Sequence, residues 1–191
     1  IGYIGFSVLV RFGKRGPPTA TETATLLFAS LLPDLVDKPL AWQFNLFASG
    51  HAIGHSIFVA LPVVAAILVV AHRRGSPRTG VAFGVGYLLH LPADVVPQSI
   101  REKELFVDRV LWPLVRGGSG YDAGFSTELT ENLTAYFGWM IEQFASGDPD
   151  PYLLVLLGVI GLDLLLWITD GMPIGREVYV ALRDRARGHE R

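Results

Sequence analysis

The sequence predicts an all-α, polytopic membrane protein with about four to five transmembrane helices and an amphipathic helix in a long outer loop. Half of the 191 residues are hydrophobic and only 18% are charged. Several apolar runs approach the roughly 20 residues that cross a bilayer, and basic residues follow alternate runs. The absence of cysteine excludes a disulfide scaffold and a thiolate metal site. A net charge of -2 disfavours binding to nucleic acid.

Five apolar segments are expected to be helical and to cross the membrane. The two strongest are residues 55–71 and 152–169, and Asp163 is the one charged residue of the second. The segment at residues 19–36 is weaker because it contains Glu22, and the segment at residues 1–10 looks like the end of a helix. In chain order the five segments are residues 1–10, 19–36, 55–71, 79–96 and 152–169.

Lysine and arginine residues predict how these segments are oriented, because short cytoplasmic loops are enriched in positive charge. The intervening loops, 34–50 and 97–151, contain few basic residues. We therefore expect one integral-membrane domain, residues 1–191, with its N-terminus outside and a basic cytoplasmic tail at 171–191. The basic residues that follow the first, third and fifth segments are Arg11, Lys14, Arg15, Arg73, Arg74, Arg78, Arg176, Arg183, Arg185, Arg187 and Arg191.

The outer loop is expected to contain an amphipathic helix over residues 126–144, with Ser126 as its N-cap. Its apolar residues recur at helical spacing and lie opposite three glutamates. Such a helix can lie at the membrane interface, cover the spans or simply pack against them. The apolar residues are Leu129, Leu133, Tyr136, Phe137, Met140, Ile141 and Phe144.

Three pairs of ionisable residues lie in or beside the predicted spans. Within each pair the residues are three or four positions apart, which places both on one face of a helix. The predicted topology also brings the pairs to one level in the outer half of the bilayer. Ionisable groups at such a depth are costly and usually functional, and imidazole with carboxylate suits Zn²⁺, Mn²⁺ or Fe²⁺. The pairs are Asp34 with Asp37, His51 with His55, and His90 with Asp94.

Each of these residues also has an ordinary structural explanation. Asp34 can cap a helix that begins in the loop, the two histidines of HAIGHS can lie at the interface, and His90 can bond a neighbouring span. Asp163 is expected near the middle of the bilayer, roughly level with His90. There it can orient that histidine, relay protons or bond a neighbouring helix.

Four short motifs lie between residues 25 and 115, namely LLPDLVDKPLAW at 31–42, Gly54-His55-Ser56, GYLLHLPAD at 86–94 and LWPL at 111–114. Together they resemble the membrane-bound metal-dependent hydrolases, a family that includes the LexA-binding, inner-membrane-associated hydrolase. DKPLAW is especially similar to the haloarchaeal members. The resemblance implies a helical membrane protein with a zinc-type site. The residues that it assigns to this site are Asp34, Asp37, His55, His90 and Asp94.

The chain departs from the pattern of that family at two positions. The family usually has a histidine near the start of its first helix, and this histidine is missing from residues 1–10. It often has a second histidine five residues before the His-Ser pair, where this chain has Gly50 and a histidine, His51, one place later.

We therefore favour a metal-dependent hydrolase with its site at the extracytoplasmic ends of the spans. The expected cofactor is a divalent ion, zinc with Mn²⁺ or Fe²⁺ as alternatives, which activates water to attack an ester. Asp37 is assigned either as the base or as the residue that orients a ligand. The assigned metal ligands are Asp34, His55, His90 and Asp94, with His51 and Asp163 as a further ligand or as hydrogen-bond partners of a ligand.

The expected location of the site at the bilayer surface favours a phosphoester or lipid-linked substrate and membrane lipids as partners. Two other functions are compatible with the same residues. In a transporter or channel, His90, Asp94 and Asp163 would form an ion or proton path. In a non-catalytic membrane scaffold, the outer loop would bind a partner. The sequence leaves the substrate, the metal and the oligomeric state open.

Overall fold

The computed structural model describes residues 1–13, 15–115 and 124–188. These residues form helices and no strand, which confirms the all-α prediction for the described chain. Lys14, the 116–123 part of the outer loop and residues 189–191 of the basic tail lie outside the described residues. In chain order the elements are α1 (Gly2–Phe12), α2 (Ala20–Trp42), α3 (Ile57–Arg73), α4 (Pro77–Glu102), the 3-10 helix η1 (Val107–Val110), α5 (Phe125–Ser146), α6 (Pro151–Thr169) and α7 (Gly175–Gly188).

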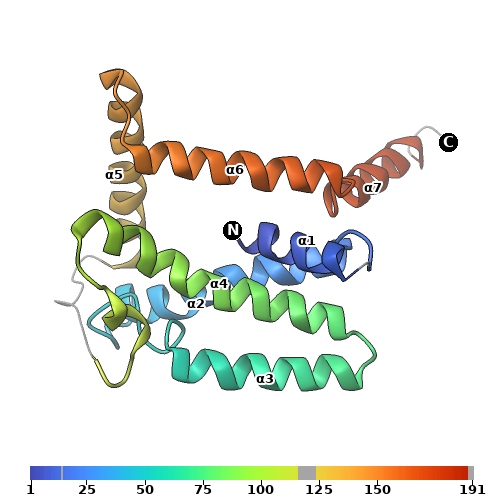
Figure 1. The fold of residues 1–191 in the computed structure, drawn as a ribbon, viewed down its shortest axis with the longest axis horizontal. Coiled ribbons are helices and arrows are strands. Elements are labelled where there is room, and N and C mark those ends of the chain that lie inside the picture. Colours follow the sequence, from blue (N-terminus) through green and yellow to red (C-terminus); the bar gives the residue numbers. More distant parts are fainter. Residues whose placement is uncertain (14, 116–123, 189–191) are drawn as a thin grey trace.

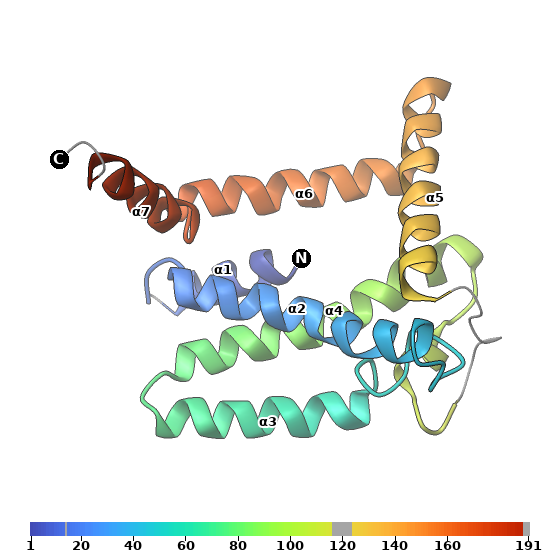
Figure 2. The ribbon, with the colours of Figure 1, turned by 180° about the vertical axis from the view of Figure 1, so that it is seen from behind.

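Five of the helices run alongside one another and a sixth crosses them. Helix α4 packs between α2 and α3, α1 contacts both α2 and α4, and α6 contacts α1 (Figure 1). Helix α5 runs across this direction, at the end of the bundle where α2 and α4 finish (Figure 2). The five parallel helices coincide with the five segments that the sequence predicted to be helical.

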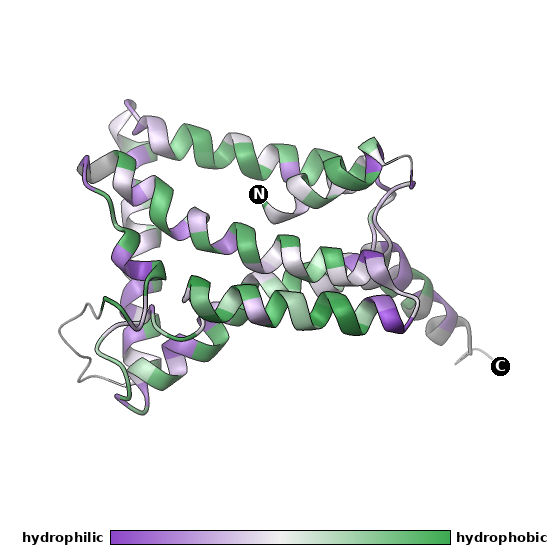
Figure 3. Ribbon diagram, turned by 60° about the horizontal axis from the view of Figure 1, so that its bottom comes forward, coloured by the Kyte–Doolittle hydropathy of each residue, from purple (hydrophilic) through white to green (hydrophobic). Residues whose placement is uncertain are grey.

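Two of these helices are long and apolar enough to cross a membrane, the part of α4 at Pro77–Ile100 and the whole of α6 at Pro151–Thr169. Helices α1 and α3 are apolar but shorter. Hydrophobic residues continue along most of α3 and α6, and hydrophilic residues gather toward the ends of the helices (Figure 3). Helices that cross a bilayer have this distribution, because their middle parts contact the acyl chains.

Helices α2 and α4 are longer than the sequence predicted. The loop expected from residue 34 begins only after Trp42, and the loop expected from residue 97 begins only after Glu102. Each helix continues through two prolines, at 33 and 39 in α2 and at 92 and 97 in α4. A proline lacks the N–H for one helical hydrogen bond, but packing between elements can override such a local preference. In this chain α2 and α4 form the most extensive helix pair.

Glycines of α4 allow this helix to approach both neighbours closely. A side chain at Gly86 would collide with the backbone carbonyl oxygen of Leu26 in α2. On the other face, a Cβ atom at Gly80 would lie 2.7 Å from the Cβ atom of Ala71 in α3. Small residues are what permit such close helix contacts. The residues that follow Leu26 in α2 and those that follow Gly86 in α4 are therefore held close to each other.

The helix in the outer loop begins at Phe125, with Gly124 rather than Ser126 at its N-cap. The prediction of a Ser126 cap was therefore wrong, because the helix starts one residue earlier and its N-cap glycine has no capping side chain. Its apolar stripe is not covered by other described helices. The exposed residues of this stripe are Leu129, Leu133, Tyr136, Phe137, Ile141 and Phe144.

A buried carboxylate joins α1 to the end of α6. The fully buried Asp170 side chain accepts hydrogen bonds from Tyr3 Oη at 2.9 Å and from Ser7 Oγ at 2.7 Å. Arg11 Nε donates to the same carboxylate at 3.1 Å. These bonds satisfy an otherwise costly buried charge and hold the two helices together at one end of the bundle.

Candidate metal centre

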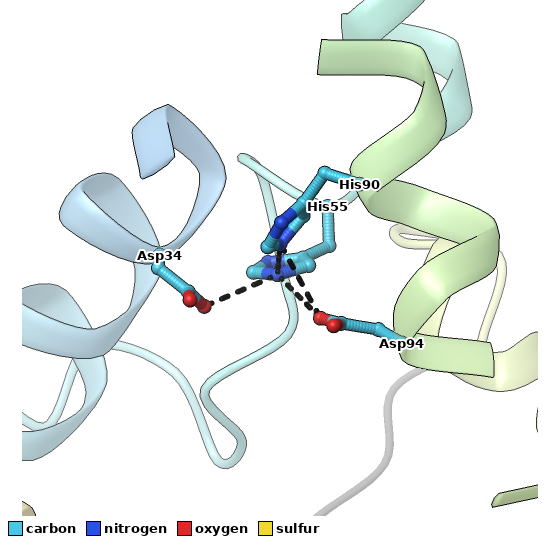
Figure 4. A group of neighbouring side chains, drawn as sticks. All are labelled: Asp34, His55, His90 and Asp94. Atoms are coloured by element: carbon cyan, nitrogen blue, oxygen red, sulfur yellow. Dashed lines mark hydrogen bonds and ion pairs between the residues drawn. The ribbon is translucent and has the colours of Figure 1, made fainter. Parts of the chain in front are cut away.

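Four ionisable side chains converge at the opposite end of the bundle. Asp34 comes from α2, His55 from the loop before α3, and His90 and Asp94 from one face of α4 (Figure 4). One nitrogen or oxygen atom from each lies within 4.8 Å of the others. The sequence identified all four residues, and the structure brings them into one cluster that could hold a metal ion.

The distances inside the cluster fit the size of a divalent ion. His55 Nε2 lies 3.1 Å from His90 Nε2, 3.2 Å from Asp94 Oδ2 and 3.5 Å from Asp34 Oδ1. His90 Nε2 lies 3.4 Å from Asp94 Oδ2. Two ligand atoms about 2.0–2.2 Å from a tetrahedral zinc ion are about 3.3–3.6 Å apart. These four separations lie near that range, and the other two pairs of ligand atoms are within 4.8 Å, so a bound ion would require a modest movement of the side chains.

The cluster is closed on the side of the histidines and open on the side of the carboxylates. The His55 side chain is completely buried, and that of His90 is 14% exposed. The side chains of Asp34 and Asp94 are each 27% exposed. The Asp34 Oδ1 atom is buried, whereas Asp94 borders an open cavity, so water or another small molecule can approach a bound ion beside Asp94, as a catalytic metal site requires.

Asp37 lies behind the cluster and orients His55. Its buried carboxylate accepts backbone N–H groups of Ala52 at 2.7 Å, Gly54 at 2.8 Å and His55 at 3.0 Å. It also lies 2.8 Å from Nδ1 of the His55 ring. A proton on Nδ1 directs the lone pair of Nε2 into the cluster, the usual partnership of a metal-binding histidine with a carboxylate.

The electrostatic surroundings of His55 favour positive charge at this position. Burial lowers the pKa of its imidazole, but hydrogen bonds to the carboxylates of Asp34, Asp37 and Asp94 outweigh burial and raise this pKa to about 10. A divalent ion bound to the carboxylates supplies positive charge in the same place. The site therefore attracts a cation, whether a proton or a metal ion.

The loop that holds His55 lies against α2 because residue 54 is glycine. A Cβ atom there would lie 2.7 Å from the carbonyl oxygen of Pro33 and 3.2 Å from Cγ of Asp37. Tyr87 Oη on α4 donates to the carbonyl oxygen of Gly54 at 2.7 Å. The Gly-His-Ser motif is thus held between α2 and α4.

The sequence analysis expected His51 and His55 to share one face of a helix, and this prediction was wrong. Both lie in the loop before α3, which begins at Ile57, because the loop N–H groups donate to Asp37 instead of forming a helix. The two rings are nevertheless in contact, with centroids 4.6 Å apart. His51 Nε2 lies 3.6 Å from Asp94 Oδ2, so this histidine stands at the edge of the cluster.

Asp163, the remaining candidate, lies on α6 and contacts α1. Its Oδ1 accepts the backbone N–H of Ile4 at 3.1 Å. This is the contact with a neighbouring helix that the sequence left open as an alternative to a contact with His90.

Lys38 is a site residue that the sequence analysis did not single out. Its Nζ lies 2.8 Å from Asp34 Oδ1. The signal was present in the sequence, because a lysine four residues after an aspartate on a helix lies next to it.

Comparison with known proteins identifies one family. The chain matches the family described as YdjM inner membrane protein over residues 2–169, a range that contains every residue of the cluster. Neither the curated proteins nor the solved structures gave a match.

We expect His90→Ala to remove most of the metal from the purified protein. The substitution deletes one of four ligand atoms, and metal affinity depends on the complete set. Metal content per protein molecule, measured by elemental analysis, tests this expectation. His72→Ala serves as the control because His72 is exposed near the end of α3 and distant from the cluster. Equal metal loss in the two variants, or full retention in His90→Ala, would contradict the site.

Asp37→Asn is expected to weaken metal affinity about 10- to 100-fold, the usual effect of removing the carboxylate partner of a histidine ligand. Because the four ligands remain, excess metal should restore full occupancy, whereas Asp34→Asn should stay depleted. Titration with Zn²⁺ measures both effects, and thermal unfolding of each variant checks that it is folded. The exposed Asp148→Asn is the control. An unchanged affinity in Asp37→Asn would refute the orienting role.

Proposed function

The chain belongs to the YdjM inner membrane protein family, and on that premise we propose that it is a membrane-bound metal-dependent hydrolase. The observation that carries the proposal is the convergence of two imidazoles and two carboxylates at distances that fit a divalent ion, with access from the carboxylate side. This combination of ligands and access is typical of hydrolytic metal sites.

In the proposed site, Asp34, His55, His90 and Asp94 hold the ion. Zinc suits these ligands best, with Mn²⁺ or Fe²⁺ as alternatives. When bound, such an ion lowers the pKa of a coordinated water molecule to about 7 and makes it a nucleophile. Asp37 keeps the Nδ1 proton of His55 in place, so it is a positioning residue in this proposal.

The proposed reaction is the hydrolysis of an ester. The oxygen of water adds to the carbonyl carbon or phosphorus atom, and the bond from that atom to the alkoxy oxygen breaks. One proton of the water ends on the departing alcohol, and the other is released from the acid product at neutral pH. Asp34 and Asp94, on the open side of the cluster, are nearest to the entering water.

We further propose that α1, α2, α3, α4 and α6 all cross the membrane, with the metal centre at the extracytoplasmic surface. The far end of the bundle collects positive charge, which favours the cytoplasmic side. There Arg78 bonds Glu22 at 2.8 Å and the carbonyl oxygen of Arg15, and Arg11 bonds Asp170.

The same arrangement assigns α5 to the outer membrane surface. Because α5 crosses the direction of the spans, it lies roughly parallel to the bilayer in this orientation (Figure 1). The second half of its exposed apolar stripe, from Tyr136 to Phe144, then contacts the boundary between headgroups and acyl chains, as is usual for interfacial helices.

The core supports a hydrolase over a transporter or channel. Between the metal centre and the basic end, the helices bury apolar side chains that include Phe6, Leu26 and Phe83. An ion path needs polar groups or water along this route. Asp163 lies at the contact of α6 with α1 and does not extend the cluster.

We expect the zinc-loaded protein in detergent to hydrolyse an activated ester, with a carboxylic ester (p-nitrophenyl butyrate) and a phosphate ester (bis-p-nitrophenyl phosphate) as probes. Chelation should abolish the release of p-nitrophenol, and added Zn²⁺ should restore it. His90→Ala should be inactive and His72→Ala fully active. A wild-type protein that binds zinc but cleaves neither probe would contradict the hydrolase assignment.

Single cysteines introduced into this cysteine-free chain test the proposed orientation. Ser146→Cys, at the end of α5, should react with an impermeant thiol reagent added to intact cells, and so should Ser49→Cys. Ser76→Cys, in the exposed turn between α3 and α4, should react only after the membrane is opened. The reverse labelling pattern would place the metal centre at the cytoplasmic face.

A further inference from the structure

A cavity of about 710 Å³ adjoins the metal centre on its open side. Its walls come from the end of α2, the loop with His51, the last turns of α4, η1 and the first half of α5. Asp94 belongs both to the cavity wall and to the metal cluster. A molecule in this cavity would therefore reach the ion from the carboxylate side.

Helix α5 forms one wall of this cavity because its first turn is attached to the end of α2. The rings of Trp42 and Phe125 lie 5.7 Å apart, and the backbone N–H of Phe125 donates to Gln43 Oε1 at 3.4 Å. The side chains of Glu128 and Leu133 then form part of the wall opposite α4. The cavity is thus an open pocket beside the metal centre, with polar and apolar surfaces.

Two cationic side chains line this cavity beside the metal ligands. Lys38 Nζ lies 2.8 Å from Asp34 Oδ1, which places an ammonium group next to a ligand atom. Arg109 Nη1 donates to the backbone carbonyl oxygen of Asp94 at 3.3 Å, which holds the guanidinium group against the turn of α4 that carries this ligand. Both cations therefore lie in the wall of the cavity that adjoins the site.

The charge around the cavity becomes more positive when the metal centre is filled. A divalent ion offsets the two negative charges of Asp34 and Asp94. Of these two ligands only Asp94 lines the cavity, and the other charged side chains in the lining are Lys38, Arg109 and the single anion Glu128. A cavity with two cations beside a metal ion favours an anionic guest over a neutral one.

We propose that Lys38 and Arg109 form an anion subsite that binds the phosphoryl group of the substrate. The inference rests on the proposed function and narrows its substrate class from esters in general to phosphate esters. A guanidinium group presents paired N–H donors that match phosphate oxygens, and an ammonium group adds a compact charge. The phosphate ester can belong to a lipid headgroup or to a soluble molecule, since both present the same group.

Calorimetric titration with inorganic phosphate tests the subsite without requiring turnover. The probe protein is loaded with one equivalent of Zn²⁺ and freed of excess metal. Lys38→Met and Arg109→Gln should each weaken phosphate binding about 10- to 100-fold, the range expected for losing a hydrogen bond to a charged group. Metal content should stay at the wild-type value in both variants, because neither residue belongs to the proposed ligand set.

Lys103→Gln is the matched control, since it removes one positive charge from an exposed position after α4 that does not line the cavity. It should bind phosphate like the wild type. Equal phosphate affinity in the wild type and in the doubly substituted Lys38→Met, Arg109→Gln protein would overturn the subsite. So would the absence of phosphate binding by zinc-loaded wild-type protein.

A second titration distinguishes a lipid headgroup from a soluble phosphate ester. The metal and activity measurements distinguish failure of the proposed function from failure of the phosphoryl subsite. Dioctanoyl phosphatidic acid in micelles should bind at least about tenfold tighter than inorganic phosphate if the natural substrate is a lipid, and with similar affinity if it is soluble. Absence of bound metal in the wild type would overturn the proposed function itself. Metal-dependent cleavage of p-nitrophenyl butyrate without phosphate binding would overturn only the phosphoryl subsite.

Discussion

The candidate site depends on one buried carboxylate, that of Asp37. This residue belongs to α2, yet its oxygens accept three backbone N–H groups and one ring nitrogen from residues 52–55. An unpaired carboxylate in this position would cost several kcal/mol, so the loop and the helix are strongly coupled. The same hydrogen bonds give the ring of His55 its orientation. A single interaction therefore shapes the loop and aims one of the candidate metal ligands.

Close packing of α2 on α4 completes the arrangement. Gly86 allows the two helix backbones to approach, and Gly54 allows the loop to lie against Pro33 and Asp37. Asp34 on one helix then joins His90 and Asp94 on the other in one cluster, with ligand atoms within 4.8 Å of one another. A cluster of this kind needs accurate distances, and packed helices supply them better than flexible loops do.

The two ends of the bundle have different chemistry, and this difference connects the fold with the proposed function. One end holds the metal cluster and its cavity, whereas the other collects arginines that pair with Glu22 and Asp170. An apolar core around Leu26 and Phe83 separates them. In a bilayer this polarity would expose the cavity at one surface, with α5 beside it at the headgroup level. The proposed topology rests on the basic end of the bundle, and the proposed substrate class rests on the cavity at the other end.

The sequence by itself determined the helical segments and the four residues that form the cluster. Apolar periodicity identifies helices, and the cost of ionisable residues in apolar segments identifies three pairs of candidates, from which the family resemblance selects Asp34, His55, His90 and Asp94 as ligands. Only the tertiary structure decided that α2 and α4 continue through their prolines, that His51 and His55 lie in a loop, and that Asp163 contacts α1. It also decided which groups surround Asp37 and that Arg109 lies beside Asp94. Spacing along a chain shows which residues share a face of one helix, but contacts between elements depend on how those elements pack.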